Sequence, residues 1–209
     1  MIMIKDIGAF WDERFSAEEY IYGEEPNEYV KEQLKKLKPG RILFAAEGEG
    51  RNAVYAATKE WEVVAFDPSE EGKKKALQLA ASKNVTIDYH ITDVANADFP
   101  LESFDALVLI YAHFQEDNRR EYHKKLAGFV KKGGYILIEG FSESHLANQK
   151  ENPKAGGPKN IKMLYNLEEL KKDFKDFQFI LSEETTTKLN EGDHHVGKAD
   201  VIRILAKKN

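Results

Sequence analysis

Short apolar runs alternate with stretches of helical periodicity from residue 41 onward. The runs are Arg41–Ala45, Glu62–Phe66, Thr86–Ile91, Phe104–Ile110 and Gly134–Glu139. Nearly continuous apolar runs are typical of parallel strands that are buried between two layers of helices. The pattern therefore predicts an α/β fold with a Rossmann-like, mostly parallel sheet and helices on both faces.

The C-terminal part of the chain breaks this alternation. After a predicted helix in LEELKKDF, Phe177–Leu189 and Ala199–Ala206 both have the composition of strands. The connection NEGDHHVGK is rich in turn residues and has no room for a crossover helix, so we expect an antiparallel pair. Together with the earlier runs, this predicts a seven-stranded sheet that ends in an antiparallel strand pair.

The 209 residues, 42% of them hydrophobic, fit a single domain spanning residues 1–209. We expect residues 1–38 to form a helical segment that covers a ligand site. Residues 141–160 are rich in Gly and Pro. Because they follow a strand end, where open α/β sheets bind ligands, they are predicted to form an irregular rim or lid loop. The alternative is a solvated loop without a role.

Composition narrows the classes of partner. The net charge of −5, without a basic stripe, argues against nucleic acid. The absence of cysteine excludes disulfides and thiol nucleophiles and suits a reducing compartment. No apolar run approaches the roughly 20 residues that cross a bilayer, and the N-terminus lacks the features of a secretory signal. We expect a cytoplasmic monomer or homodimer with no membrane partner.

The stretch RILFAAEGEGRNA combines a strand, a turn of small residues and a helix start. Gly48 and Gly50 leave room for a ligand, and the following helix is expected to present unpaired N–H groups. With Ala53, the glycine spacing also fits a dinucleotide fingerprint, so NAD is a competing ligand. Glu47 and Glu49 would repel a pyrophosphate unless they point to solvent, which favours a cationic ligand such as S-adenosylmethionine.

Acidic residues follow the next two predicted strands. Asp67 lies 67 − 50 = 17 residues after Gly50, close to the roughly 20 expected for an acid that binds ribose hydroxyls. The alternative is that Asp67 caps the following helix. At the end of the third strand, Asp93 could bind the adenine amine while Val94 offers a backbone N–H, or Asp93 could only terminate the strand.

The order of the motifs resembles that of class I S-adenosylmethionine-dependent methyltransferases. The similar branch includes the tellurite-resistance methyltransferases and, more distantly, the thiopurine methyltransferases. The motifs are WDERF, YGEEPNEYV, ILFAAEGEGRNA, VVAFDPSEEG, ITDV, LVLIYAHF, KKGGYILIEGF and HVGKADVIRILAKK.

This resemblance implies a cofactor site for S-adenosylmethionine, which is released as S-adenosylhomocysteine. Its residues would be Trp11, Tyr22, Gly23, Glu47, Gly48, Gly50, Arg51, Asn52, Asp67, Ser69, Asp93, Val94 and Tyr111. The chain departs from the family pattern at Phe44, where an acid is usual, and at Ala46, where glycine is usual. Alanine is acceptable if its φ is negative. Without the acid, the cofactor's ammonium needs another partner, such as Glu47 or a backbone carbonyl.

The resemblance also implies an in-line methyl transfer, for which alignment matters more than a base. Candidate catalytic residues are Tyr111, His113 and His195, with Glu139 and His194 as further possible bases. Ordinary roles as scaffold or turn residues are the alternatives. No metal site is expected, because the His194–His195 pair lacks a third ligand at recognisable spacing. The predicted function is methyl transfer to a small-molecule acceptor with an S, Se, Te, N or O nucleophile. An NAD-dependent oxidoreductase and a non-catalytic S-adenosylmethionine sensor are the alternatives.

Overall fold

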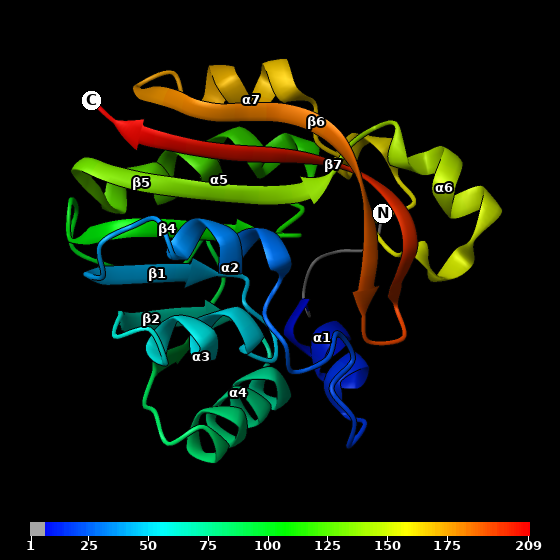
Figure 1. The fold of residues 1–209 in the computed structure, drawn as a ribbon, viewed down its shortest axis with the longest axis horizontal. Helices are drawn as coiled ribbons and strands as arrows, with labels where there is room; N and C mark the ends of the chain where they lie inside the picture. The colour runs from blue at the N-terminus through cyan, green and yellow to red at the C-terminus, as the bar shows by residue number, and fades with distance from the viewer. Residues whose placement is uncertain (1–6) are drawn as a thin grey trace.

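Seven strands form one sheet in the computed structural model, which describes residues 7–209 (Figure 1). The strands are β1 (Arg41–Ala45), β2 (Glu62–Asp67), β3 (Asp88–Ile91), β4 (Phe104–Ile110), β5 (Val130–Phe141), β6 (Phe177–Glu191) and β7 (His195–Lys208). Their order in the sheet is β3-β2-β1-β4-β5-β7-β6. All neighbouring pairs from β3 to β5 are parallel, whereas β7 pairs antiparallel with both β5 and β6. The predicted sheet is confirmed.

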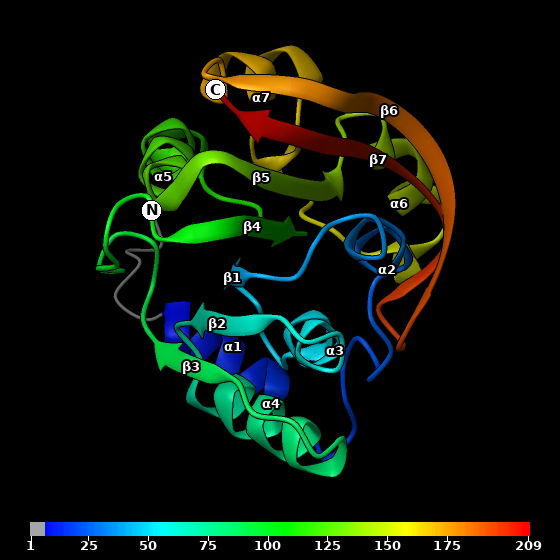
Figure 2. The same ribbon diagram turned by 60° about the vertical axis from the view of Figure 1, so that its left-hand side comes forward.

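Helices cover both faces of the sheet, as predicted (Figure 2). They are α1 (Ile7–Phe15), α2 (Glu28–Leu34), α3 (Arg51–Ala57), α4 (Glu70–Ser82), α5 (Glu116–Phe129), α6 (His145–Glu151) and α7 (Leu167–Asp173). Apolar residues of α2, α3 and α4 pack on one face of the sheet, and those of α5 and α7 pack on the other. No helix among residues 7–209 combines the length and apolarity needed to span a membrane.

Several strand boundaries differ from the prediction. β5 begins at Val130 rather than Gly134, because Val130 already pairs with Phe104 before the register shifts and Tyr135 pairs with Ala106. β3 begins at Asp88 and is shorter than expected. The carboxyl ends move by at most two residues, because β2 ends at Asp67 rather than Phe66 and β5 at Phe141 rather than Glu139.

The C-terminal hairpin is longer than its turn-rich sequence indicated. Glu191 pairs with His195 across the strands, so residues 192–194 alone form the turn. In Figure 1 the hairpin curves away from the sheet toward the segment that follows α1. This curvature carries the hairpin tip to the carboxyl edge of the parallel strands.

The prediction of an irregular loop over residues 141–160 was wrong. The segment contains α6 and a 3-10 turn at Pro153–Ala155, and the carbonyl of Gly156 accepts hydrogen bonds from His145 and Gln149. The segment therefore has regular local structure, and its role as a rim or lid stays a prediction.

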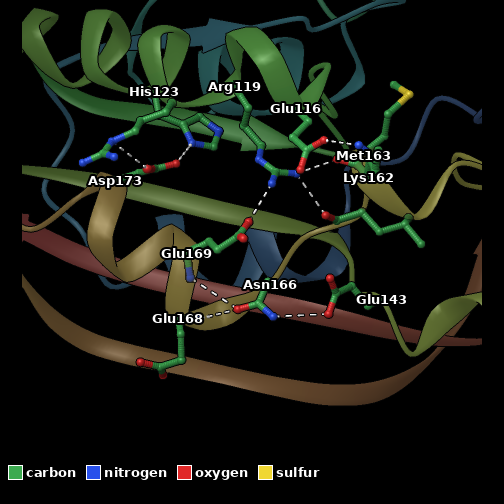
Figure 3. A network of polar contacts seen from close by, with 12 residues as sticks. Glu116, Arg119, His123, Glu143, Lys162, Met163, Asn166, Glu168, Glu169 and Asp173 are labelled. Carbon is green, nitrogen blue, oxygen red and sulfur yellow. Dashed lines mark hydrogen bonds and ion pairs between the residues drawn. The ribbon is translucent and has the colours of Figure 1, made fainter.

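A polar network fixes the chain just beyond this segment to α5 (Figure 3). Arg119 donates from Nη1 to the carbonyls of Lys162 and Leu164, each at 3.1 Å, and from Nη2 to Glu169 at 2.7 Å. One turn along α5, His123 Nδ1 lies 2.8 Å from Asp173. These contacts hold residues 162–164 and α7 against α5.

The N-terminal segment contains α1 and α2, as expected for residues 1–38, of which residues 1–6 lie outside the described part. Asp12 accepts hydrogen bonds from Ser69 Oγ (2.6 Å) and Glu71 N (3.0 Å) at the start of α4. Phe15 is buried, and a Cβ added to Gly48 would lie only 3.1 Å from its ring. The helix α1 therefore lies across the turn that follows β1.

Candidate functional site

The turn after β1 adopts left-handed conformations at three positions. Gly48 has a φ of 59° and Gly50 a φ of 84°, and a Cβ on Gly50 would lie 2.4 Å from the Cβ of Ala76. Ala46 has a φ of 54°, so the negative φ that would make alanine acceptable at this glycine position is absent. The turn therefore stores backbone strain at Ala46.

Glu47 caps α3, which corrects the expectation of unpaired N–H groups at this helix. Its Oε1 atom accepts hydrogen bonds from Asn52 N (3.0 Å) and Ala53 N (2.7 Å). Burial among protein atoms raises the pKa of the Glu47 carboxyl to about 7. Because a side-chain carboxyl occupies the position that a dinucleotide's pyrophosphate would need, this turn does not suit NAD.

Glu49 is buried and does not point to solvent. Its carboxylate lies 2.8 Å from Lys75 Nζ and accepts a 2.9 Å hydrogen bond from Ile21 N. The neighbouring Arg51 donates to the carbonyl of Tyr22 at 3.2 Å. The turn is thus bonded directly to the segment that follows α1.

Asp67 lies at the end of β2 with its carboxylate directed at the same turn. Oδ2 accepts from Gly48 N (3.1 Å) and Oδ1 from Ser69 N (3.0 Å). Each oxygen retains capacity for a second donor, such as a ribose hydroxyl. Burial raises the pKa of Asp67 to about 6. Ser69, rather than Asp67, caps α4 by accepting from Gly72 N. Since its hydroxyl also donates to Asp12, Ser69 has a structural role.

The loop after β3 lies beside Asp67, because Thr92 N donates to the Asp67 carbonyl at 3.1 Å. Asp93 accepts from both Asn96 N and Asn96 Nδ2 at 2.8 Å. Val94 is buried in the core. The structure brings these residues to the same edge as the β1 turn, as predicted.

A buried carboxylate at the end of β5 connects elements that are distant in sequence. Glu139 has no exposed surface, and its Oε1 accepts from Asn27 Nδ2 (2.6 Å) and Tyr111 Oη (3.0 Å). Its Oε2 accepts from Arg203 Nε at 2.5 Å. With these donors in place, Glu139 pairs with an arginine rather than a lysine and is poorly suited to act as a base.

Tyr111 is held in an unusual backbone conformation after β4, with a φ of 53°. Its ring stacks on Phe141 at 4.6 Å and contacts the His195 ring edge-on at 4.6 Å. Burial raises the pKa of Tyr111 well above its ordinary value, and the nearby Glu139 charge adds to the effect. The phenol is therefore protonated at neutral pH.

A second buried ion pair joins α3 to the hairpin tip. Arg51 Nη2 lies 2.8 Å from Glu191 Oε2, and His195 Nδ1 lies 3.1 Å from the same oxygen. Burial alone would raise the pKa of Glu191, but the Arg51 charge lowers it to about 2. Asn27 donates to the other Glu191 oxygen at 3.0 Å, so Asn27 bridges Glu139 and Glu191.

The predicted histidines have different environments. His113 Nε2 accepts from Phe141 N (3.1 Å), and Nδ1 lies 2.9 Å from the Met163 carbonyl. Burial lowers its pKa to about 3. With both nitrogens bonded to backbone, His113 has a structural role, which contradicts its expected role as a base. His195 is buried against Tyr22, with ring centres 4.5 Å apart, whereas His194 is exposed.

A cavity of about 400 Å³ adjoins this network. Its walls include Tyr22, Gly23, Arg51, Glu139 and Glu191. A larger hollow of about 650 Å³ lies along β3 but includes none of the predicted site residues. We therefore consider the smaller cavity the better candidate for a binding site.

Sequence reasoning missed Asn27, Glu191 and Arg203. Asn27 occurs in the motif YGEEPNEYV, from which only an aromatic and a glycine residue were selected. Glu191 and Arg203 become adjacent to the site only through the strand pairing of β7, so no local pattern could reveal them.

Parts of known proteins resemble this chain. Residues 42–134 match the model of a methyltransferase domain. No curated protein matches the sequence.

Solved structures share the architecture at low sequence identity. One, from a study of the conversion of a disulfide bond into a thioacetal group during echinomycin biosynthesis, is 17% identical with a TM-score of 0.76, and the match covers 97% of this chain and 89% of the other. TehB from Haemophilus influenzae is 19% identical with a TM-score of 0.71 over 97% of this chain and 67% of its own. Magnesium protoporphyrin IX methyltransferase from Synechocystis PCC 6803 was solved with bound S-adenosylhomocysteine. It is 13% identical with a TM-score of 0.69, and the match covers 98% of this chain and 95% of the other.

These identities establish likeness of fold. The match over residues 42–134 agrees with the predicted methyltransferase activity, and the shared architecture confirms the predicted Rossmann-like fold.

Proposed function

We propose that this chain transfers the methyl group of S-adenosylmethionine to a small-molecule acceptor by in-line displacement. The observation that carries the proposal is the chemistry of the β1 turn. Glu47 fills the anion position at α3, while the Asp67 carboxylate retains capacity for ribose hydroxyls. A nucleoside with a cationic sulfur and no phosphate suits this arrangement.

In this proposal Asp67 binds the ribose, Asp93 and Val94 border the adenine, and the turn at Gly48 and Gly50 borders the methionine portion. Trp11, Tyr22 and Gly23 cover the cofactor from the N-terminal segment. When bound, the cofactor supplies a methyl group that is already activated by the sulfonium charge. The chain's own residues then align the reactants and exclude water.

The acceptor side combines Tyr111 with His195. Burial lowers the pKa of His195, with the Glu191 hydrogen bond opposing the shift, so its imidazole is neutral at pH 7. Its Nδ1 atom lies 3.1 Å from Glu191 Oε2, so Nε2 is the nitrogen through which His195 would act as a base. An acceptor whose nucleophile is soft or already deprotonated, such as a thiolate, selenolate or tellurium species, would not require it.

We propose that the cavity of about 400 Å³ admits the acceptor. The cavity borders Tyr22 and Glu139, which contact His195 and Tyr111. This volume suits a small molecule, and the lining carries charges of both signs, Glu24, Glu25 and Glu28 as well as Lys188 and Arg203. The expected branch, that of tellurite-resistance and thiopurine methyltransferases, is part of this proposal, and the likeness to TehB supports it at the level of fold.

Calorimetric titration tests the cofactor assignment. We expect S-adenosylmethionine and S-adenosylhomocysteine to bind the wild-type chain, and NAD to give no heat. Asp67→Asn should weaken binding by about 1–3 kcal/mol, because one carboxylate oxygen that accepts from ribose is replaced by a donor. Asp98→Asn, on the loop before β4, serves as a control and should bind normally. Binding of NAD alone would reverse the assignment.

Turnover separates an enzyme from a sensor. The chain and cofactor are incubated with a panel of thiols, selenite, tellurite, amines and phenols, and the products are examined by mass spectrometry for the gain of one methyl group. Methylation of at least one acceptor is expected. Tight cofactor binding with no methylated product from any class would instead support a sensor.

A further inference from the structure

Arg14 is a cation without an anionic partner beside the proposed cofactor site. Two other cations contact the β1 turn or its surroundings, and both are paired: Arg51 with Glu191 and Lys75 with Glu49. Within residues 7–209, Arg14 makes no ion pair, and its Nε atom is buried without a hydrogen-bond partner. A buried donor left unsatisfied is unfavourable, and its retention calls for an explanation such as a ligand.

The position of Arg14 points toward the site rather than away from it. Arg14 precedes Phe15, the residue of α1 that packs on Gly48. Its guanidinium carbon lies 5.8 Å from the centre of the Tyr22 ring. The Arg14 charge also contributes to lowering the pKa of His195. The guanidinium therefore lies near the two rings that border the proposed methyl-transfer position.

Charge complementarity identifies the group that Arg14 would bind. The carboxyl groups of Glu47, in the turn, and Asp67, at the end of β2, lie at this edge and make its potential negative. The same groups would repel the cofactor's carboxylate unless a cation accompanies it. A guanidinium binds a carboxylate through two parallel hydrogen bonds. On α1, the helix that covers the proposed site, Arg14 has a guanidinium and makes no ion pair within residues 7–209.

We infer that Arg14 binds the carboxylate of the methionine portion of S-adenosylmethionine. This inference rests on the proposed function. Binding of the carboxylate would satisfy the orphaned Nε and would fasten α1 over the cofactor. Arg14 is thus a cofactor-binding residue that couples closure of the N-terminal segment to one functional group of the ligand.

The test compares S-adenosylmethionine with its decarboxylated form, which lacks only the carboxylate. Calorimetry is performed on the wild-type chain and on Arg14→Gln, Arg14→Lys and Glu13→Gln. Glu13 is exposed on the same helix and serves as the matched control. We expect Arg14→Gln to bind S-adenosylmethionine about 10- to 100-fold more weakly, since a charge-assisted bond is lost. Its affinity for the decarboxylated ligand should match that of the wild type, and Arg14→Lys should lie between the two.

Each outcome distinguishes the two proposals. Loss of affinity confined to the ligand that has the carboxylate supports the inference. Equal losses for both ligands would overturn it, because they would indicate that Arg14 only holds Tyr22 in place. If the wild-type chain binds neither ligand, the proposed function itself fails. Circular dichroism of each variant verifies that the fold is intact.

Discussion

At the scale of single residues, strain and burial mark the edge where the strands end. Ala46 and Tyr111 both have positive φ, and both lie immediately after strands at this edge. Strained non-glycine residues persist only where surrounding contacts fix them, and they concentrate at functional sites. For Tyr111 those contacts are the Glu139 hydrogen bond and the rings of Phe141 and His195. For Ala46 no side-chain bond exists, so its strain should be removable.

We predict that Ala46→Gly stabilises the protein by about 0.5 kcal/mol. Relief of a left-handed alanine yields roughly 1–2 kcal/mol, which the greater freedom of glycine in the unfolded chain offsets by about 0.4–1 kcal/mol. Ala45→Gly, in the adjacent strand, is the control and should cost about 1–2 kcal/mol. Urea unfolding of both variants measures the difference. Equal destabilisation by the two changes would contradict the strain at Ala46.

Sequence reasoning identified the edge proposed to bind the cofactor but not all of its side-chain roles. Asp67 and the glycine turn were recognisable, because strand ends and small residues leave local patterns. His113 was assigned incorrectly, since the sequence cannot show that Phe141 N and the Met163 carbonyl engage both of its nitrogens. The partners of Glu139 come from three separate parts of the chain. Contacts between such distant parts of the chain leave no pattern in the local sequence.

At the scale of elements, the β6–β7 hairpin connects the sheet to the N-terminal segment. The number of strands and the antiparallel pair could be predicted from the pattern of apolar runs and turns, because that pattern is local. The placement of β7 between β5 and β6 could not be predicted in this way. That placement directs the hairpin tip to the site, where Gly192 packs on the backbone of Ile21. The hairpin therefore supports the segment that covers the cofactor edge.

We predict that Gly192→Ala loosens this contact. A Cβ at Gly192 would lie 2.1 Å from the Ile21 carbonyl oxygen, and φ is 57°. Gly133→Ala is a matched control, since its φ is also positive, at 76°, but its nearest neighbouring atom would lie 3.8 Å away. Both changes place an alanine in a left-handed backbone conformation, which lowers the free energy of unfolding. The additional decrease for Gly192→Ala, about 1–3 kcal/mol, measures the effect of the close approach to Ile21.

Two measurements compare the Gly192→Ala and Gly133→Ala variants. Urea unfolding gives the free-energy difference, and amide hydrogen exchange should accelerate over residues 20–27 in Gly192→Ala alone. Unchanged exchange in that range would show that the hairpin tip does not support the N-terminal segment.

At the scale of the whole molecule, buried ionisable groups give opposing pH dependences. Burial lowers the pKa of four histidines: His113, His123, His145 and His195. These histidines stay neutral in the folded state while the unfolded chain protonates near pH 6.5, so their contribution to stability is lost as pH falls below that value. Burial raises the pKa of Glu47 to about 7 and of Asp67 to about 6. Their contribution is present at low pH and is lost as pH rises through about 6 to 7.

Because four histidines oppose two carboxyls, we predict that the free energy of unfolding decreases between about pH 7 and pH 5. Glu47→Gln removes one group that takes up a proton in the folded state, so its stability should fall more steeply over this range. His194→Gln is the control: His194 is exposed, and the slope should equal that of the wild type. Urea unfolding at several pH values measures each slope. A wild-type stability that rises toward pH 5 would mean that Glu47 and Asp67 outweigh the buried histidines.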